Sequence, residues 1–543
     1  MKKRNKKPIQ LLGLFTGLVL LSVSCTKDPV IVTAISIDKT DMIVQVSATT
    51  TLSTFLTPAD ATNKTVTWRS GSNSIATVAD GAVTGVALGS TTITAISQSD
   101  TTVKATCSVL VTPSTGQVIT ISGVITADQK WYANAKYLLS GFVYVKNNAV
   151  LTIEPGTIIK GISGTKAALM IERGSKIMAQ GTIDKPIVFT SDKPVGQRAS
   201  GDWGGLVLCG KATTNKHDSG TGVGVAEGGI GSLYGGTDDA DNSGILQYVR
   251  IEFPGIALTA TANSEINGLT LYSVGSGTTI DHIQVSYSGD DSYEWFGGAV
   301  NCKYLVCIRG LDDEYDTDNG FKGKLQFLLG IRDPNISDQS GSNGFESDND
   351  ADGSVLTPIT KPTFSNVTLY GPLSVSATLP ANHLFKRAMH IRRGSRLSVY
   401  NSVFVGWPKG LLIDGALGDS PVQAESNELQ IQNCIMAGMT ANYEQATGTP
   451  ANPYTTTQIE AYYTAPARSN ALNTLAEILG ANLITITNPA LLPAASSPAL
   501  TGASFTNTRL TDSFFTPVTY KGAFGSTNWT SGWCNFDPQN TVY

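Results

Sequence analysis

Carboxylate side chains are concentrated in one stretch of the chain, between residues 290 and 352. This stretch contains 14 of the 43 acidic residues but only five basic ones. Carboxylates repel one another at short range unless a cation lies between them, and hard divalent cations, Ca²⁺ above all, prefer oxygen ligands. We therefore expect calcium to be bound by some of the following residues: Asp290, Asp291, Asp312, Asp313, Asp316, Asp318, Asp348, Asp350 and Asp352.

The acidic clusters recur beside three aromatic residues, Phe296, Phe321 and Phe345, which are 25 and 24 residues apart. In a protein built from stacked repeats, equal offsets from a landmark place side chains above one another. The clusters are then expected to form one column of carboxylates. The alternative is a solvated acidic face without a bound ion.

One segment within this stretch has the pattern of a calcium-binding loop. Residues 348–353 read Asp-Asn-Asp-Ala-Asp-Gly, with oxygen-bearing side chains at alternate positions followed by glycine. This matches the first half of an EF-hand loop. The twelfth position holds Ile359 in place of the bidentate glutamate, so the segment is not an EF-hand and needs ligands from other turns of the chain.

A group of basic residues further along the chain offers candidates for a proton-abstracting base. The group comprises Lys386, Arg387, His390, Arg392, Arg393 and Arg396. None of the four histidines lies in a Ser/His/Asp or Cys/His pattern that specifies a nucleophile. The six cysteines after residue 25 lack the spacing of a zinc site, and we interpret them as core thiols.

The composition predicts the elements that must position these side chains. Charged residues are only 15% of the 543 residues, and Gly, Thr, Ser, Val and Ile are frequent. This balance favours many short strands and argues against helical bundles and against disorder. The net charge is −5, and it is about −10 without the five basic residues at positions 2–7, so nucleic-acid binding is not expected.

Residues 1–24 have the pattern of a secretory signal, with basic residues followed by an apolar run from Ile9 to Val23. The run is short for a membrane span and ends at Leu21-Ser22-Val23-Ser24-Cys25. This ending resembles a bacterial lipobox, although Ser22 stands where an apolar residue is usual. The resemblance implies acylation of Cys25, which would anchor the protein to the outer membrane, where we expect it to face the cell exterior.

Residues 31–113 are the first predicted domain, after a short anchor linker at residues 25–30. Stretches such as Thr91–Ala95 alternate with the period of half-buried strands, and turn signals separate them, which predicts a small β-sandwich. The segments Leu56–Trp68, Ile75–Val78 and Gly89–Ala95 resemble the bacterial immunoglobulin-like group 2 family (BIG2). The resemblance implies a spacer or adhesive module without catalytic residues.

A different repeat occupies residues 114–543, the second predicted domain. Leu151–Ile159, Leu169–Ile177 and Met389–Leu397 share one pattern, and short strands ending in glycine recur along this region. Such strands cannot bury their inward side chains alone and need the next turn of the chain as a partner. We therefore predict an all-β chain, in which the small sandwich is followed by a large right-handed parallel β-helix with C-terminal decorations. One helix is expected outside the strands, at Ser469–Leu479.

The second domain looks like the pectate-lyase-like superfamily. More narrowly, it resembles Bacteroidetes surface lipoproteins with blocks such as Gly201–Leu208 and Asn343–Asp350. We favour a non-catalytic, calcium-stabilised binding or adhesion protein for a glycan or a partner receptor, in which Trp203, Trp295 and Trp407 are available to stack on sugar rings.

The alternative is a calcium-dependent polysaccharide lyase acting on an acidic polysaccharide. In that reading Arg387, Arg392 or Arg393 faces the acidic column across a groove. No motif specifies the base, and the Gly-His-Gly motif of polygalacturonases is absent from the sequence. These observations favour binding over catalysis.

Overall fold

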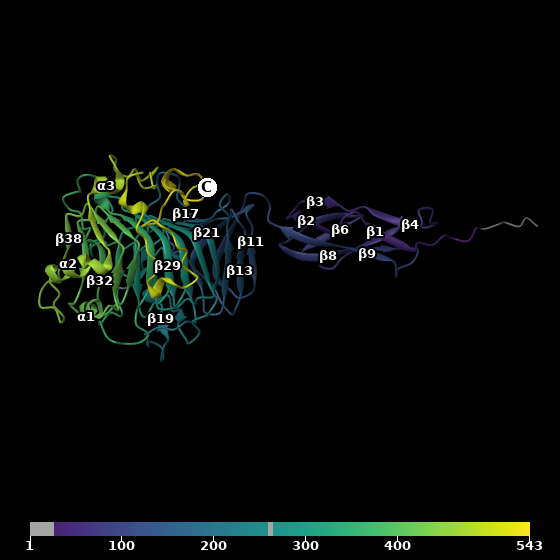
Figure 1. Ribbon diagram of the computed structural model, residues 1–543. Helices are drawn as coiled ribbons and strands as arrows, with labels where there is room; N and C mark the ends of the chain where they lie inside the picture. Colours follow the sequence, from purple (N-terminus) through teal and green to yellow (C-terminus); the bar gives the residue numbers. More distant parts are fainter. Residues whose placement is uncertain (1–26, 259–263) are drawn as a thin grey trace, which may run out of the picture. The chain divides into compact units, whose positions relative to one another are not determined.

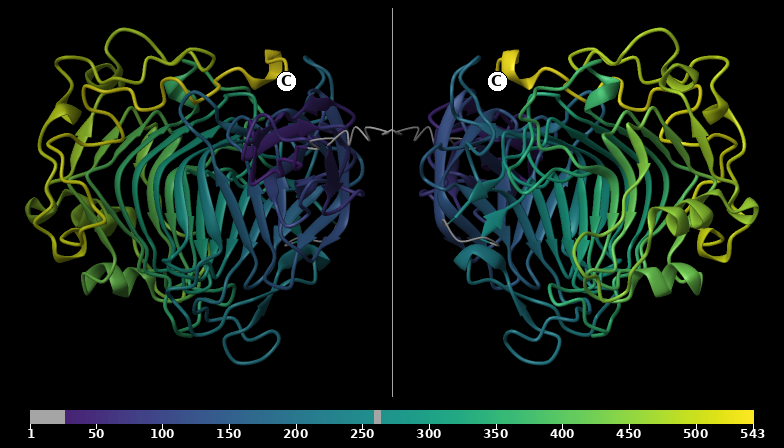
Figure 2. Two further views of the ribbon diagram at one scale, coloured as in Figure 1. Left: turned by 90° about the vertical axis from the view of Figure 1, so that its right-hand side faces the viewer. Right: turned by 90° about the vertical axis from the view of Figure 1, so that its left-hand side faces the viewer.

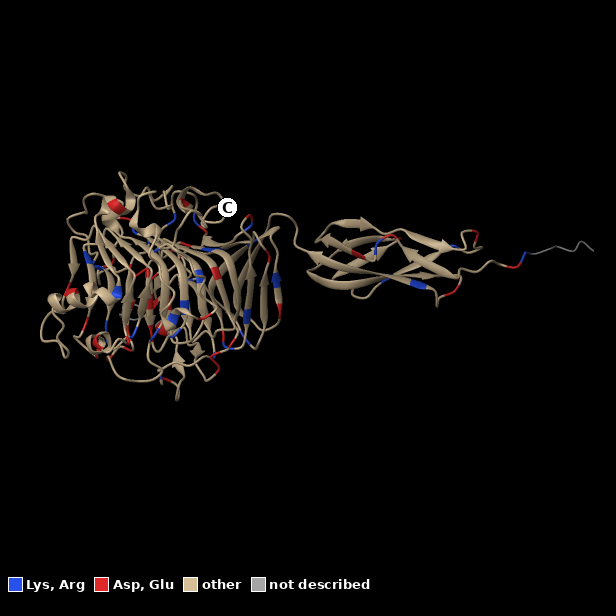
Figure 3. Ribbon diagram, in the orientation of Figure 1, with Lys and Arg blue, Asp and Glu red and all other residues tan. Residues whose placement is uncertain are grey.

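Two β-rich units follow one another along the chain, Met1–Ser114 and Thr115–Tyr543 (Figure 1). The computed structural model describes residues 27–258 and 264–543. The predicted signal segment and Cys25 lie outside these ranges. No helix among the described residues is long and apolar enough to cross a membrane. Charged residues are sparse on both units (Figure 3).

The first unit has the predicted β-sandwich architecture. A sheet of order β2–β9–β8–β5 and a sheet of order β3–β7–β6 share one core, in which Val83 of the smaller sheet meets Ile93 and Val109 of the larger. A further pair, β1–β4, completes the unit. The strands are β1 (Ala34–Ile37), β2 (Asp41–Gln45), β3 (Thr49–Thr51), β4 (Thr54–Thr57), β5 (Val66–Ser70), β6 (Ala76–Ala79), β7 (Ala82–Gly85), β8 (Gly89–Ser97) and β9 (Lys104–Thr112).

The second unit is a parallel β-helix, which confirms the predicted solenoid. Among the described residues, 26 of its strands form one continuous sheet in which strands of successive turns pair in parallel. Figure 1 shows these strands side by side in chain order, and Figure 2 shows the turns stacked behind one another. The apolar core runs through the inside of this stack, from Tyr137 to Tyr463. All six described cysteines are free thiols, and five are buried.

One column of paired strands carries the acidic residues, and we call it the site column. It consists of β12 (Ala135–Val145), β15 (Ala168–Ile171), β18 (Gly205–Cys209), β24 (Leu269–Tyr272), β26 (Tyr293–Phe296), β28 (Tyr315–Asp318), β30 (Phe345–Ser347), β32 (Arg387–Ile391), β35 (Lys409–Ile413) and β38 (Ala441–Tyr443). Two short hairpins lie outside the stack, formed by β19 (Gly224–Val225) with β20 (Leu233–Tyr234) and by β22 (Ile256–Ala257) with β23 (Glu265–Ile266).

The other strands form the remaining faces. Five long strands change direction at one residue with positive φ, and the rings at these corners stack: His282 lies 4.4 Å from Tyr248 and 4.3 Å from Tyr304 between centroids. Stacking offsets the strain of bulky residues in the left-handed region. The long strands are β21 (Gly244–Glu252), β25 (Thr279–Ser286), β27 (Asn301–Ile308), β29 (Lys324–Ile331) and β31 (Thr363–Tyr370). The other strands of these faces are β10 (Gln117–Ile125), β11 (Gln129–Trp131), β13 (Val150–Ile153), β14 (Ile158–Gly161), β16 (Lys176–Gln180), β17 (Ile187–Ser191), β33 (Ser398–Tyr400), β34 (Val403–Val405), β36 (Gln430–Gln432), β37 (Ile435–Ala437) and β39 (Ala471–Asn473).

The described residues contain three α-helices, α1 (Ser420–Glu425), α2 (Thr456–Thr464) and α3 (Leu475–Leu479). A capping box of Thr455 and Gln458 starts α2. The prediction of one helix at Ser469–Leu479 is wrong in its first half, because residues 471–473 form β39. Pairing of β39 with β37 and the left-handed conformation of Ser469 override the helical tendency of this segment.

Candidate functional site

The strands of the site column place acidic side chains at matched positions on successive turns. Glu294 of β26 pairs with Asp316 of β28, which pairs with Glu346 of β30, and Glu346 pairs with His390 of β32. The residue before each of these is buried in the core, so the four side chains face outward. We call these four residues the acidic row. Neighbouring strands are about 4.8 Å apart, which brings the carboxylates close together.

The strand register differs from the one that the spacing of Phe296, Phe321 and Phe345 suggests, because these three residues do not occupy equivalent positions on successive turns. Phe345 is stacked on Tyr315 and Tyr293, whereas Phe321 follows β28 and packs against Trp295. The connections between turns differ in length, so a nearly constant spacing of 25 and 24 residues does not mark equivalent positions. The column of carboxylates nevertheless exists, because aspartates and glutamates lie one residue after the core residues of β26, β28 and β30.

Aspartates in the loops that precede β26 and β28 lie beside the acidic row. The backbone N–H of Asp313 donates to Asp291 Oδ1 at 2.7 Å, and the backbone N–H of Asn343 donates to Asp313. Each of these two carboxylates is therefore hydrogen-bonded to the backbone of the next turn of the β-helix. Two groups of oxygens are tight enough to hold a cation, one from Asp290, Asp291 and Asp312 and the other from Asp291, Glu294 and Asp316. Within each group, the oxygen atoms lie within 4.8 Å of one another.

An asparagine that sequence reasoning missed belongs to the same site. Asn267 is only 2% exposed, and its Nδ2 donates to Glu294. Its Oδ1 has no hydrogen-bond partner, and neither does Asp316 Oδ1. A signal existed in the sequence: Asn267, Asp291, Asp313 and Asn343 each lie two residues before a core residue of the site column. Glu294 and Glu346 were also not selected as ligands.

Burial and mutual repulsion disfavour the charged forms of these acids. Burial, reinforced by neighbouring carboxylates, raises the pKa well above the usual value for the following groups: Asp290, Asp291, Glu294, Asp313, Asp316 and Asp318. The same causes, with Asp338 as the main neighbour, raise the pKa of Asp312 to about 6. A second group that sequence reasoning missed, Glu227, has a pKa raised to about 7 by burial and by Glu265, against the opposing effect of Lys216.

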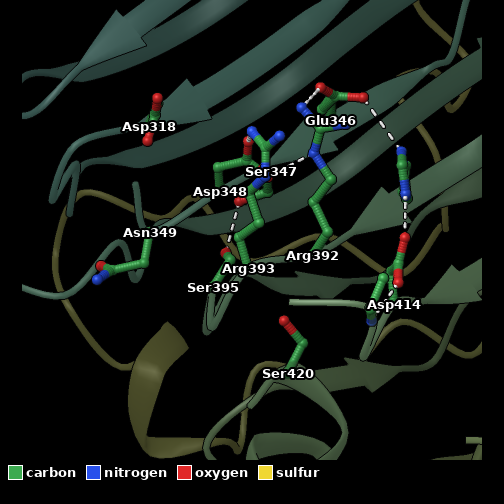
Figure 4. Close-up of polar contacts among 12 residues, drawn as sticks. Asp318, Glu346, Ser347, Asp348, Asn349, Arg392, Arg393, Ser395, Asp414 and Ser420 are labelled. Carbon is green, nitrogen blue, oxygen red and sulfur yellow. Dashed lines mark hydrogen bonds and ion pairs between the residues drawn. The ribbon is translucent and has the colours of Figure 1, made fainter. Parts of the chain in front are cut away.

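The next turns of the site column are neutralised by basic side chains (Figure 4). Arg392 pairs with Glu346, and its Nε lies 2.7 Å from Asp348 Oδ1. Arg393 Nη1 lies 2.6 Å from Asp348 Oδ2. Burial disfavours the charged form of Glu346, yet Arg392 and His390 hold its pKa at about 2. Ion pairs found among the described residues therefore involve the acids of β30 and of the loop after it, but not Glu294 of β26 or Asp316 of β28.

Four of the six candidate bases, His390, Arg387, Arg392 and Arg393, are engaged in ion pairs, whereas none is found among the described residues for Lys386 or Arg396. His390 Nδ1 lies 3.1 Å from Glu346 Oε2, and its Nε2 lies 3.1 Å from Asp414 Oδ2. Arg387 Nε lies 2.7 Å from Glu444 Oε2. A base must offer a free lone pair to its substrate. Arg387 Nη1 also lies 3.1 Å from His390 Nδ1, so both ring nitrogens of His390 already have polar partners.

The EF-hand-like segment does not supply its carboxylates to either oxygen group. Asp348 is held by two arginines, and Asp352 is exposed. Asp350 stabilises the turn that it belongs to, because its Oδ1 accepts hydrogen bonds from the backbone N–H groups of Asp352 and Ser354, both at 3.0 Å. Asp318 lies apart from the arginines in Figure 4.

The three tryptophans considered for sugar stacking are not available for it. Trp203, Trp295 and Trp407 are fully buried, and Trp203 stacks on Phe189 inside the β-helix. Large aromatic side chains contribute most when they fill a core, and this role explains all three positions.

Comparisons with known proteins identify both domains. Residues 123–477 match the pectate-lyase-like β-helix domain, and residues 31–109 match the bacterial Ig-like domain of group 2. An uncharacterised protein of Clostridium acetobutylicum is 34% identical over 93 residues, which are 17% of this chain and only 10% of that protein. Because the first match covers more than half of the chain, the chain belongs to the pectate-lyase-like β-helix family. The two domains together indicate a cell-surface protein related to carbohydrates.

Proposed function

We propose that this member of the pectate-lyase-like β-helix family is a lipid-anchored outer-membrane protein that binds a glycan or a partner receptor without catalysis. Calcium, held by the acidic residues of β26 and β28 and their preceding loops, stabilises the binding surface. The BIG2 domain is the spacer between the anchor at Cys25 and the β-helix.

The calcium site rests on one observation, the presence of two converging groups of carboxylate oxygens without a basic partner. None of the ion pairs found among the described residues includes Asp290, Asp291, Glu294, Asp312 or Asp316, whereas the neighbouring turn is fully paired. Like charges this close require a counter-ion to remain ionised at neutral pH. Calcium accepts six to eight oxygen ligands in flexible geometry, which suits carboxylates from several turns.

The pairing of the three arginines that were considered as bases favours binding over polysaccharide cleavage. Arg387, Arg392 and Arg393 all contact carboxylates. The rival, a calcium-dependent lyase, is supported only by the position of these basic residues on the same column as the acids.

A single screen separates the two functions. The purified chain is mixed with uronate polymers in calcium or in chelator, while binding and ultraviolet absorbance are both recorded. We expect calcium-dependent retention without the absorbance growth that an unsaturated lyase product causes. Asp316→Asn is expected to weaken retention, whereas Asp352→Asn, which removes an exposed acid outside both oxygen groups, is the matched control. Absorbance growth that Arg392→Ala abolishes would establish the lyase.

Lipid anchoring has its own test. Cys25→Ser is expected to release the chain from the membrane fraction, because the acylated thiol is lost. Protease treatment of intact cells reports which side the β-helix faces, and protection of the wild-type chain would contradict the exterior location.

A further inference from the structure

The acidic residues of the row differ between β28 and β30 in whether they pair with basic side chains. Glu294 and Asp316 on the first two strands contact no basic side chain among the described residues, whereas Glu346 on the third pairs with Arg392 and His390. The fold is continuous across this change, since β26, β28 and β30 pair in unbroken register. The difference therefore lies in the side chains that the adjoining turn supplies.

Arg392 has the contacts that a bridging cation would make. Its guanidinium touches Glu346 with Nη2 and Asp348 with Nε, so it joins two carboxylates from one turn (Figure 4). Arg393 completes the neutralisation of Asp348. A guanidinium carries a permanent charge and five donors but no acceptor, so it cannot yield its place to a metal ion by losing a proton.

The unneutralised part of the row also has oxygens without a donor. Asn267 Oδ1, on a side chain that is 2% exposed, lacks a hydrogen-bond partner although its Nδ2 is bonded to Glu294. Asp316 Oδ1 lacks one as well. Buried oxygens normally have partners; here one of the two belongs to Asp316 of the second oxygen group, and the other lies on Asn267, which donates to Glu294 of that group.

We propose that Arg392 is the built-in counter-ion that ends the metal-binding part of the row and thereby sets how many calcium ions the β-helix binds. The proposal rests on the calcium site of the proposed function. Without Arg392, Glu346 would keep only His390 and Asp348 only Arg393 as partners, and the two carboxylates would lie next to Asp316 of the adjacent strand with one fewer positive charge among them. Calcium can then occupy the place of the guanidinium.

Equilibrium dialysis of the full chain against calcium chloride tests this. Arg392→Gln is expected to bind one more calcium ion per chain than the wild type and to show a larger calcium-dependent rise in melting temperature. Arg392→Lys, which keeps the charge, is the matched control and is expected to bind the wild-type number. Arg392→Gln combined with Asp348→Asn is expected to lose the gain, because the new group then has one carboxylate fewer.

The outcomes are separable. If the wild type binds calcium and folded Arg392→Gln binds no more, the inference is wrong while the proposed metal site stands. If neither chain binds calcium, the metal site of the proposed function fails as well. If Arg392→Gln is unfolded in chelator but folded in calcium, the proposal is supported. A variant that is unfolded in both would overturn it, because calcium would not have replaced the arginine.

Discussion

Replacing Asp312 with asparagine is expected to stabilise the chain clearly in chelator but much less in calcium. Asp312 contributes an oxygen to the group with Asp290 and Asp291, and Ser340 Oγ donates to its Oδ2 at 2.8 Å. Burial and Asp338 raise the pKa of Asp312 from 3.8 to about 6. In the folded chain without metal, its charge at pH 7 is therefore destabilising.

The magnitude follows from the pKa. A rise of about two units corresponds to about 3 kcal/mol of unfolding free energy at pH 7, as an order of magnitude. The folded state binds the proton more tightly than the unfolded state, so this contribution favours folding below about pH 4. It is lost as the pH rises from about 4 to about 6. In chelator, Asp312→Asn is thus expected to stabilise the chain by up to about 3 kcal/mol at pH 7 and by little at pH 4.

With calcium this gain is expected to shrink, because weaker calcium binding by the variant offsets the relief of repulsion. The variant lacks one anionic ligand, and a site filled at 100 times its dissociation constant contributes about 2.7 kcal/mol that is partly lost. Urea denaturation at pH 4 and pH 7, in calcium and in chelator, measures all four values, with exposed Asp352→Asn as a control for removing one acid. A variant that is destabilised equally in calcium and in chelator would refute both the repulsion and the metal site.

Three further changes test other parts of the structure. Because the pKa of Glu346 is about 2, its ion pairs stabilise the fold above the unfolded pKa of about 4.5 and are lost as the pH falls towards 2. Glu346→Gln should abolish this acid dependence of the urea midpoint. An unchanged dependence would contradict the ion pairs. Phe321→Ala removes a fully buried ring stacked 5.5 Å from Trp295. It is expected to lower the free energy of unfolding, measured by urea denaturation, by about 3–5 kcal/mol. A decrease below about 1 kcal/mol would mean that the ring is not packed there. Asp350→Ala removes the hydrogen bonds from the backbone N–H groups of Asp352 and Ser354, and should destabilise the chain by about 1–3 kcal/mol. The number of calcium ions bound in equilibrium dialysis should not change. A lower number would make Asp350 a ligand.

The repeat pattern was sufficient to predict the β-helix, because stacking of short strands is a consequence of local periodicity. It also placed a column of acids between residues 290 and 352. The choice of ligands was less accessible, since it depends on loop lengths between turns. Asn267 is 24 residues before Asp291 in sequence, yet the two precede neighbouring strands of the site column. The shared offset of two residues before a core residue recovers that relation only once the core residue of each turn is known.

The partners of each acid were the least predictable feature. Asp348, Asp350 and Asp352 looked equivalent in a calcium-loop pattern, but the structure gives them three environments: an arginine pair, a closed turn and solvent. Arg392 reaches Asp348 across 44 positions of sequence. Such contacts follow from which turn lies next in the stack, and a single sequence specifies this only through the whole fold.

The arrangement of charges has a consequence for binding. Burying many acids side by side is unfavourable unless each receives a counter-ion. The β-helix pairs Glu346 with Arg392, whereas the described part of the chain offers no ion pair to Glu294 or Asp316, and the pKa of Asp316 is raised. If calcium fills the latter, it becomes part of the surface that a ligand meets. A ligand carboxylate that shares the ion would bind the folded chain only when calcium is present, so ligand binding, calcium binding and stability are linked. Arg392 keeps this linkage to one segment of the site column, because a permanent guanidinium charge needs no external ion.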